Sequence, residues 1–195
     1  MKLVILGRDG ILNQYREDHV KSPDEWLPIE GALEAVARLH HAGWHVVVAT
    51  NQAGVGRGMI DMASVNAVHV HMVQRVQAVG GRIDAVFFCP HTPEDHCECR
   101  KPLPGMMLDI GNRYGVDLST VPMASDTVRD LEAAQAAGCP AHLILSGRAA
   151  LCDEAQRAQW LQRVPSAQVH DSLSAFVDHL LGEQPASEDG RSATS

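Results

Sequence analysis

Short apolar runs alternate along the chain with longer segments whose apolar residues recur at helical spacing. Each run ends in a polar or Gly-containing turn, which is typical of buried strands connected by helices. The pattern predicts strands at residues 2–6, 45–49, 83–88, 121–125 and 141–145. It predicts helices at residues 33–42, 63–79, 105–114 and 127–137, and two weaker ones at 153–163 and 172–181.

This β-α alternation with short connections predicts an α/β fold, a Rossmann-like, doubly wound parallel sheet with helices on both faces and right-handed crossovers. We expect one domain over residues 1–182, with a metal-binding loop at residues 89–104. Residues 14–29 are polar and broken by prolines, and we expect them to cover the mouth of a site. Residues 183–195 are rich in Ser, Gly and charge, which predicts a disordered tail.

Composition narrows the class of protein. The chain has 195 residues, 45% of them hydrophobic and 21% charged, which suits one globular domain. A net charge of -8 argues against general binding to nucleic acid or anionic membranes. We expect no membrane span and no signal peptide, because no apolar run is long enough to cross a bilayer and the chain enters a strand at once. Without an obvious exposed apolar stripe, we expect a monomer.

Three of the five cysteines fall close together, at Cys89, Cys97 and Cys99, with His91 between them. Three thiols and one imidazole form the closed, tetrahedral donor set that structural zinc prefers. An odd number of clustered cysteines favours a reducing compartment, and so the cytoplasm, over a disulfide framework. The alternatives are three free cysteines beside a chance histidine, or His96 as the fourth ligand, although its position next to Cys97 would strain the chelate.

The remaining cysteines and two histidines receive simpler interpretations. Cys139 and Cys152 lie far from the cluster and are expected to be ordinary thiols. His69 and His71 are two residues apart in a predicted helix, so they do not share a face. We expect them to be solvated rather than metal ligands.

Polar residues follow three of the predicted strands, and in a parallel sheet such strand ends converge on one edge. Asp9 follows the first strand, Thr50 the second and Asp126 the fourth. The two carboxylates could hold Mg²⁺, and the Thr50 hydroxyl could contact an anion. The nearby cations are Arg57, Arg100 and Lys101. Taken singly, these residues could equally be turn, capping or solvated positions. Together they are the parts that phosphoryl transfer needs.

At these positions the sequence resembles the haloacid dehalogenase superfamily of phosphatases, in its histidinol-phosphatase-like branch. The resemblance runs from Lys2 to about Gly147, and the cysteine loop joined directly to Cys-Arg-Lys-Pro is its narrowest motif. The segments that carry it are residues 8–10, 20–26, 49–52, 81–91, 99–102 and 126–130.

The resemblance implies a Mg²⁺-dependent phosphatase that removes one phosphate from a sugar bisphosphate, with a heptose 1,7-bisphosphate expected, through an aspartyl-phosphate intermediate. It implies that Asp9 is the general acid/base and that its backbone carbonyl binds Mg²⁺. Thr50 would steady the phosphoryl oxygens, Lys101 would offset negative charge, and Asp126, supported by Asp130, would bind Mg²⁺. The cysteine loop would hold a structural zinc ion. Substrate contacts are implied for Arg8, Asn51, Gln52, Arg57 and Arg100.

The sequence departs from the family at the nucleophile. The first aspartate of the Asp-x-Asp motif is replaced by Gly7, which offers neither a carboxylate for attack nor a metal ligand. Losing a covalent nucleophile costs on the order of 10⁴ to 10⁶ in rate. Arg8 cannot replace it, because its guanidinium stays protonated and would point to the other face of an extended strand. Ser125 also stands where the family usually has glycine, and it could crowd the metal site.

Two main hypotheses follow. In the first, the chain is a phosphatase by fold and site, with a change at Gly7. In the second, it is a pseudo-phosphatase that binds a phosphorylated ligand or partner without turnover. Histidinol phosphate or another small phosphoester is an alternative substrate, and an interaction module built on the cysteine loop is a weaker possibility.

Overall fold

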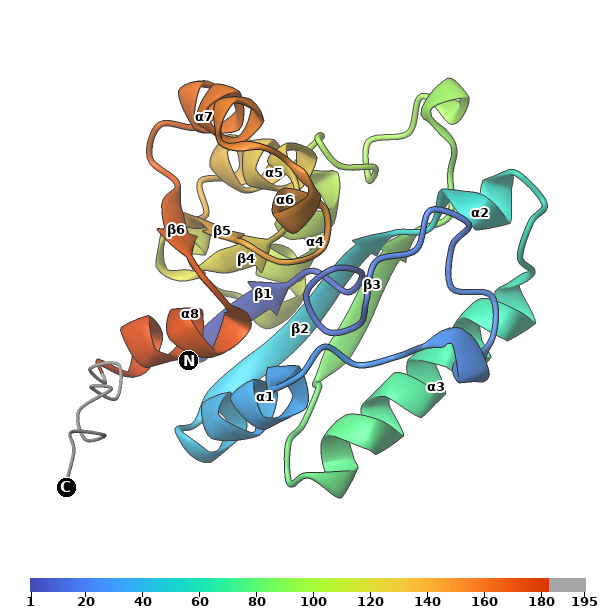
Figure 1. Cartoon of the computed structure of the whole chain (residues 1–195), viewed down its shortest axis with the longest axis horizontal. Helices are drawn as coiled ribbons and strands as arrows, with labels where there is room; N and C mark the ends of the chain where they lie inside the picture. Colours follow the sequence, from blue (N-terminus) through green and yellow to red (C-terminus); the bar gives the residue numbers. More distant parts are fainter. Residues whose placement is uncertain (183–195) are drawn as a thin grey trace, which may run out of the picture.

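The computed structural model describes residues 1–182, and it contains one six-stranded sheet in which every pairing of neighbouring strands is parallel. The strand order is β3-β2-β1-β4-β5-β6, so β1 lies between the first and second halves of the chain (Figure 1). The strands are β1 (Lys2–Leu6), β2 (Trp44–Asn51), β3 (Ala85–Cys89), β4 (Met123–Ser125), β5 (Ala141–Ile144) and β6 (Gln168–His170).

Helices cover both faces of this sheet. They are α1 (Ala32–His41), α2 (Ala53–Gly56), α3 (Met62–Ala78), α4 (Gly105–Tyr114), α5 (Val128–Ala137), α6 (Gly147–Leu151), α7 (Glu154–Arg163) and α8 (Leu173–Leu181). Short 3-10 turns occur at Pro23–Glu25, Pro93–Asp95 and Leu118–Thr120. Helices α1, α3 and α8 pack together on one face, whereas α4, α5 and α7 pack on the other (Figure 1).

Each strand of the first half sends alternate side chains into two separate cores. In β1, Val4 and Leu6 belong to the core under α1, α3 and α8, whereas Leu3 and Ile5 belong to the core under α4 and α5. Because β1 is buried on both faces, its sequence is a continuous apolar run rather than an alternating one. The predicted doubly wound α/β fold is therefore confirmed.

The termini of the predicted helices agree closely with the structure. The span Gly105–Tyr114 is the one predicted, and Ser172 caps α8 by accepting a hydrogen bond from the Ala175 amide. Asp153 caps α7 in the same way. These ends were predictable because side-chain oxygens satisfy the free amides of a first helical turn.

Two elements beyond residue 145 were absent from the prediction. Strand β6 has an exposed Gln168 and a 44% exposed Val169, so it lacks the buried apolar run that marks the other strands. Helix α6 has only five residues, too few to show a helical period. The predicted disordered tail, residues 183–195, lies outside the described residues. Within residues 1–182, no helix combines the length and the apolar character needed to cross a membrane.

Candidate functional site

A polar cavity of about 210 Å³ opens at the carboxyl ends of the central strands. It lies where the strand order reverses, because β1 pairs with β2 on one side and with β4 on the other. Open α/β sheets bind ligands at such switch points. The cavity is lined by Arg8, Asp9, Tyr15, Arg16, Glu17, His19, Thr50, Asn51, Ala53, Arg57, Arg100, Lys101, Asp126, Thr127, Arg129, Asp130 and Arg148.

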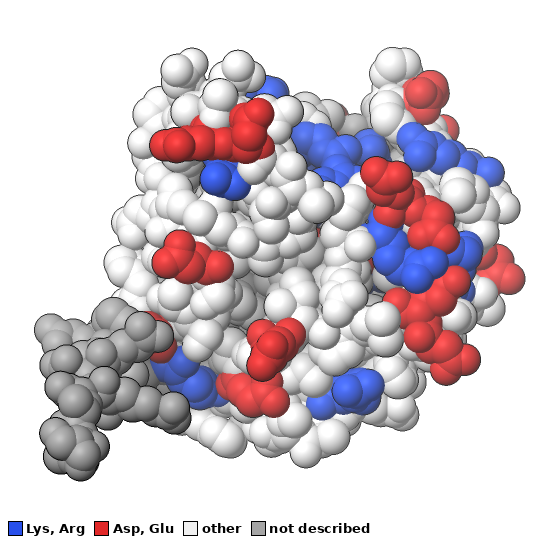
Figure 2. All heavy atoms as spheres, in the orientation of Figure 1, with Lys and Arg blue, Asp and Glu red and all other residues white. Residues whose placement is uncertain are grey.

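Most of the predicted site residues therefore meet around one cavity. The chain from Tyr15 to His19 lines it, as the predicted covering loop required. Basic side chains gather in the hollow between the helices at the upper left and the loop at the upper right of Figure 2. A local excess of positive charge suits a ligand that carries phosphate, although the whole chain is acidic.

Gly7 is buried directly after β1, and Ser125 of the neighbouring strand stands beside it. A Cβ atom on Gly7 would lie 3.0 Å from the Ser125 hydroxyl oxygen and 3.2 Å from Ile11 Cγ1. The Ser125 hydroxyl donates a 2.6 Å hydrogen bond to the Asp130 carboxylate. Ser125 would therefore crowd any side chain introduced at residue 7.

The Asp9 carboxylate is held by donors on both oxygens. Arg8 donates to Oδ1 from Nη2 at 2.9 Å, Asn13 donates to Oδ1 at 3.0 Å, and Gln52 donates to Oδ2 at 3.0 Å. Although burial acts in the opposite direction, the Arg8 charge and these hydrogen bonds lower the pKa of Asp9. Asp9 is therefore ionised at neutral pH in this arrangement.

The expectation that His69 is solvated is wrong. His69 is buried in α3, and its Nε2 lies 3.1 Å from Nη1 of Arg8. Burial, and next the Arg8 charge, lower the pKa of His69 to about 4, so its neutral ring accepts a hydrogen bond from Arg8. Helical spacing could have revealed this, because His69 falls on the buried face of α3 that carries Val65 and Met72.

Arg8 and Gln52 are therefore committed to protein groups. The Arg8 side chain is 1% exposed, and its guanidinium bonds Asp9 and His69. Gln52 is buried and donates to Thr50 Oγ1 at 2.9 Å as well as to Asp9. These contacts suit the positioning of Asp9 and Thr50 better than direct contact with substrate.

Lys101 reaches the cavity from the loop before α4. Its ammonium donates to the Ala49 carbonyl at 2.8 Å and forms a 2.6 Å ion pair with Asp130. The Asn51 amide bonds both the carbonyl oxygen and the amide nitrogen of Lys101, at 3.0 and 3.2 Å. Strand β2 thus fixes the backbone of Lys101 beside Thr50, which is buried at the strand end.

Asp126 lies immediately after β4, and its carboxylate occupies space that is left open by two glycines. A Cβ atom on Gly10 or Gly147 would collide with its carboxylate, and both glycines have positive φ angles. The Arg148 amide donates to Asp126 Oδ2 at 2.7 Å. Burial, with a contribution from the neighbouring Asp130 charge, raises the pKa of Asp126 to about 7.

This arrangement fits a magnesium ion. A buried carboxylate whose charged form is disfavoured gains from a nearby dication. Among the described residues, no donor is hydrogen-bonded to the Asp9 carbonyl oxygen, so that oxygen is also available. Mg²⁺ commonly binds one or two protein oxygens and takes its remaining ligands from water and phosphate.

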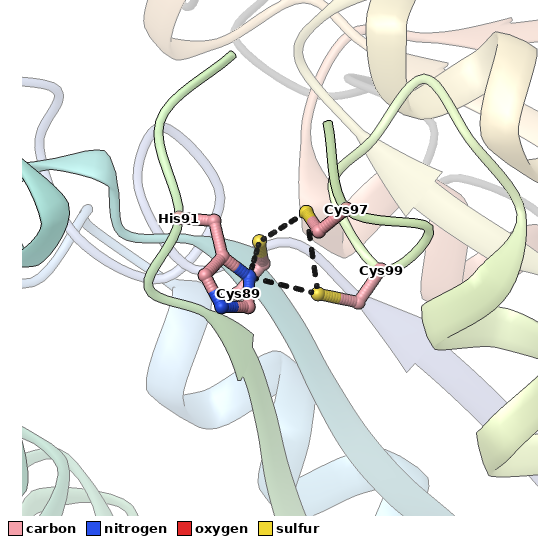
Figure 3. Close-up of side chains that lie close together, drawn as sticks. All are labelled: Cys89, His91, Cys97 and Cys99. Carbon is pink, nitrogen blue, oxygen red and sulfur yellow. Dashed lines mark hydrogen bonds between the residues drawn. The ribbon is translucent and has the colours of Figure 1, made fainter. Parts of the chain in front are cut away.

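The cysteine cluster lies on the loop between β3 and α4, next to the cavity. Its ligand atoms lie within 4.8 Å of one another, and the four side chains point toward a common centre (Figure 3). The Cys89 and Cys99 sulfurs lie 3.5 and 3.4 Å from His91 Nδ1, and both lie 3.6 Å from the Cys97 sulfur. A tetrahedral site with Zn–S bonds of about 2.3 Å has edges of similar length.

The structure thus brings together Cys89, His91, Cys97 and Cys99, and not His96, as a group that could hold a metal. Burial raises the pKa of the Cys89 thiol to about 12, whereas hydrogen bonds from Cys89 and Cys99 outweigh burial and lower the pKa of Cys97 to about 7. A bound dication would favour the thiolate form of all three. Cys139 is buried and Cys152 partly buried, and both are free, in line with ordinary thiols.

Among the cavity residues that were not singled out from the sequence are Tyr15, His19, Arg129 and Arg148. Tyr15 and His19 come from the covering loop, and His19 has an unusual positive φ of 63°. The Arg148 guanidinium lies over the Tyr15 ring, 4.6 Å from its centroid. Arg148 follows β5 in chain order, so the rule that identified Asp9 and Asp126 also applied there.

Two protein-family models match this chain. A HAD-hydrolase-like model matches residues 98–175, and a polynucleotide kinase 3 phosphatase model matches residues 9–128. The second match covers more than half of the chain and includes the region of Asp9, Thr50, Lys101 and Asp126.

Curated relatives extend the match over nearly the whole chain. A D-glycero-beta-D-manno-heptose-1,7-bisphosphate 7-phosphatase from Neisseria meningitidis serogroup A is 42% identical over 187 residues, which are 95% of this chain and 98% of that protein. The protein of the same name from Bordetella bronchiseptica is 54% identical over 147 residues, 75% of this chain and 82% of that protein.

A solved structure agrees with both the sequence and the fold. It is D,D-heptose 1,7-bisphosphate phosphatase from B. bronchiseptica complexed with magnesium and phosphate, which is 46% identical to this chain. The alignment covers 94% of this chain and 100% of the other, with a TM-score of 0.84. This chain therefore belongs to the haloacid-dehalogenase-like phosphatases, in the family of the D-glycero-beta-D-manno-heptose-1,7-bisphosphate 7-phosphatases.

Proposed function

We propose that this protein binds D-glycero-D-manno-heptose 1,7-bisphosphate with Mg²⁺ and acts on its 7-phosphate as a phosphoric monoester hydrolase, with turnover limited by Gly7. The observation that carries the proposal is the convergence of Asp9, Thr50, Lys101 and Asp126 on one basic cavity. The substrate is taken from the names of relatives that align with up to 95% of the chain.

In this proposal the transferred phosphate lies between the Thr50 hydroxyl and the Lys101 ammonium. Thr50 Oγ1 accepts from Gln52, so its own hydrogen is free to donate to a phosphoryl oxygen. Lys101 is oriented by Ala49 and Asp130 and adds positive charge where negative charge develops. Asn51 fixes the Lys101 backbone, while Arg57 and Arg100 stand at the rim of the cavity.

Asp9 is proposed to act as the general acid/base, which takes a proton from the attacking oxygen and gives one to the leaving oxygen. Its pKa is lowered by Arg8, so the ionised form, which a general base requires, predominates at neutral pH. Arg8, with His69 behind it, keeps the carboxylate in one orientation. Without a carboxylate at residue 7, the route left to this chain is direct attack by water. Asp9 takes a proton from the water as its oxygen bonds to phosphorus, the bond from phosphorus to the sugar oxygen breaks, and the protonated Asp9 gives the proton to that oxygen.

Mg²⁺ would be held by the Asp126 carboxylate and the Asp9 carbonyl, and when bound it would neutralise phosphate charge. Asp130 supports this end of the site through Lys101 and Ser125. Zn²⁺ would be held by Cys89, His91, Cys97 and Cys99, where it would fix the shape of the loop that carries Arg100 and Lys101. Both assignments use the donor chemistry of the residues present.

One observation, Gly7, favours a second candidate function. A binder that turns over too slowly to matter would keep the same cavity and the same ligand. We also propose a cytoplasmic location, because the five described cysteines are free and a thiol metal site needs reducing conditions. A monomeric state stays our prediction.

Calorimetric binding to the unmodified chain tests the ligand assignment without relying on turnover. We expect the heptose bisphosphate to bind in a Mg²⁺-dependent manner and more tightly than histidinol phosphate. Thr50→Val should weaken binding about 10-fold, because it removes one hydroxyl donor to a charged group, whereas Thr120→Val on the far 3-10 turn should not. Binding that ignores Mg²⁺, or a preference for histidinol phosphate, would contradict the proposal.

A further inference from the structure

Three histidines gather at the β6 edge of the sheet, outside the cavity and the cysteine cluster. His142 belongs to β5, His170 ends β6 and His179 belongs to α8. His142 is in register with Gln168, and residues two apart in a strand share a face, so His142 and His170 point to the same side. Phe176 contacts both of their rings, and His179 follows it by three residues on the same face of α8.

The ring positions match those of imidazoles that share one metal ion. The His170 centroid lies 5.2 Å from the His142 and His179 centroids, which are 5.8 Å from each other. Three imidazoles on a tetrahedral ion, with metal–nitrogen bonds of about 2.1 Å, have centroids about 5 Å apart. His142 Nδ1 and His170 Nε2 face each other at 3.0 Å, near the edge length of about 3.4 Å in such a tetrahedron.

The third ligand has to turn toward the other two. Among the described residues, the cysteine cluster is the one group whose ligand atoms already lie within 4.8 Å of one another, so a nitrogen of His179 must come closer. His179 is exposed on α8, which leaves its side chain room to rotate. The ion would replace the hydrogen between His142 and His170, and that proton would move to the other nitrogen of the same ring. Both rings would then stay neutral, which is the form that binds metals.

The electrostatic surroundings favour a bound dication. Burial, and next the charges of His170 and His179, lower the pKa of His142 to about 4, so protons compete little for its lone pair at neutral pH. Asp171 is exposed next to His170, and its negative charge acts on that ring and would also attract a cation. Imidazole ligands suit zinc, copper and nickel, whereas magnesium prefers oxygen.

We propose that His142, His170 and His179 form a second site for a divalent transition-metal ion, with Zn²⁺ as the ion to test. Three protein ligands leave the fourth position to water. The ion would fasten β6 and α8 to β5. Strand β6 has three residues, lies at the edge of the sheet and buries little apolar surface, so the metal would supply stability that packing does not. The site is independent of the proposed phosphatase activity.

The test counts the Zn²⁺ ions bound per chain at a buffered concentration of free zinc that saturates the unmodified chain. The variants are His170→Asn and His179→Asn, and His41→Asn, an exposed histidine at the end of α1, is the control. We expect each cluster variant to bind one ion fewer than the unmodified chain, whereas the control binds the same number. Loss of one ligand should weaken the site about 100-fold, which is the share of one ligand in a four-ligand zinc site.

Amide hydrogen exchange locates the ion within the fold. Zn²⁺ should slow exchange in β6 and α8 of the unmodified chain and of His41→Asn, but not of His179→Asn. Zinc bound at the cysteine loop or at the cavity carboxylates would protect other segments and persist in every variant. Equal zinc content in all four chains, or protection confined to those other segments, would overturn the proposal and leave the histidines as packed aromatic rings.

Discussion

The two sides of the cavity differ in how many of the functional groups expected of a phosphatase they carry. On the β2 side, Thr50 accepts a hydrogen bond from Gln52, and Asn51 donates to the Lys101 carbonyl. The Lys101 ammonium in turn donates to the Ala49 carbonyl and to Asp130. On the side between β1 and β4, Gly7 offers no side chain and Ser125 turns its hydroxyl toward Asp130. The first side carries the groups that we propose to bind phosphate, and the second lacks the group expected to attack it.

This difference indicates that binding and attack are structurally separable here. None of the hydrogen bonds that hold Thr50, Lys101 or Asp126 needs a side chain at residue 7. Loss of the nucleophile can therefore leave the phosphate site assembled, because its residues are supported by β2, α5 and the start of α6.

The largest effect should follow removal of the central cation. Lys101→Met in a Gly7→Asp background should lower phosphate release by about 10³-fold, since it removes charge stabilisation of the transition state. It should also cost about 3 to 5 kcal/mol in the free energy of unfolding, because the buried Asp130 loses its ion pair. Turnover assays and urea unfolding measure the two effects. A stable, active Lys101→Met variant would show that the β2 side is not the binding side.

The next largest effect is expected in the cysteine loop, on its zinc content and its sensitivity to proteolysis. Cys97→Ala should reduce zinc content from about one ion per chain to near zero, because structural sites need four ligands. The loop over residues 89–104 should then become sensitive to proteolysis, and Cys152→Ala, outside the cluster, is the control. Metal analysis with limited proteolysis measures both. Unchanged zinc content in Cys97→Ala would refute the ligand set.

A substitution at Ser125 tests whether turnover is limited by Gly7 alone or by both Gly7 and Ser125. A restored Asp at residue 7 would bring its Cβ to 3.0 Å from the Ser125 hydroxyl. We expect Ser125→Gly to raise the turnover of Gly7→Asp about 10-fold by removing this crowding, and to lower stability by about 1 kcal/mol through the lost hydrogen bond to Asp130. Equal rates with and without Ser125→Gly would confine the defect to Gly7.

His69 gives a smaller, pH-dependent effect. Its pKa is about 4 in the folded chain and near 6.5 when unfolded, so the unfolded state binds more protons between these values. Stability should therefore fall as the pH drops from about 6.5 toward 4, and Arg8 and Asp9 are the charged groups that face the ring. At pH 5 the loss through His69 should be about 1 to 2 kcal/mol.

The matched variant is His69→Gln, which keeps an acceptor for Arg8 but does not titrate. Thermal unfolding at pH 7.5 and pH 5 should show a smaller drop for this variant than for the unmodified chain. An equal drop would mean that His69 is already protonated or does not contact Arg8.

The sequence predicted the sheet and the strand-end residues because both follow from local patterns. Apolar runs mark strands buried on both faces, and the carboxyl ends of parallel strands meet at one edge. That logic was sufficient for Asp9, Thr50 and Asp126, which line one cavity. The four-residue metal cluster was predicted instead from the close spacing of three cysteines and one histidine.

The remainder depended on contacts between distant segments. The contact between the His69 ring and the Arg8 guanidinium joins residues that are 61 positions apart. The stacking of Arg148 on Tyr15 joins the first and fifth βα connections. Edge strand β6 and the five-residue α6 have too little apolar pattern to mark them. The close approach of Ser125 to Gly7 needs the register between β1 and β4.

The most direct test of the account is phosphate release from heptose 1,7-bisphosphate with Mg²⁺, measured for the unmodified chain, Gly7→Asp and the isosteric Gly7→Asn. If the site is intact and lacks only its nucleophile, Gly7→Asp should be at least about 10⁴-fold faster than the other two, which should bind substrate but release little phosphate. Rapid release by the unmodified chain, or no gain in Gly7→Asp, would contradict the claim that the missing carboxylate at Gly7 is the main difference between this site and an active phosphatase.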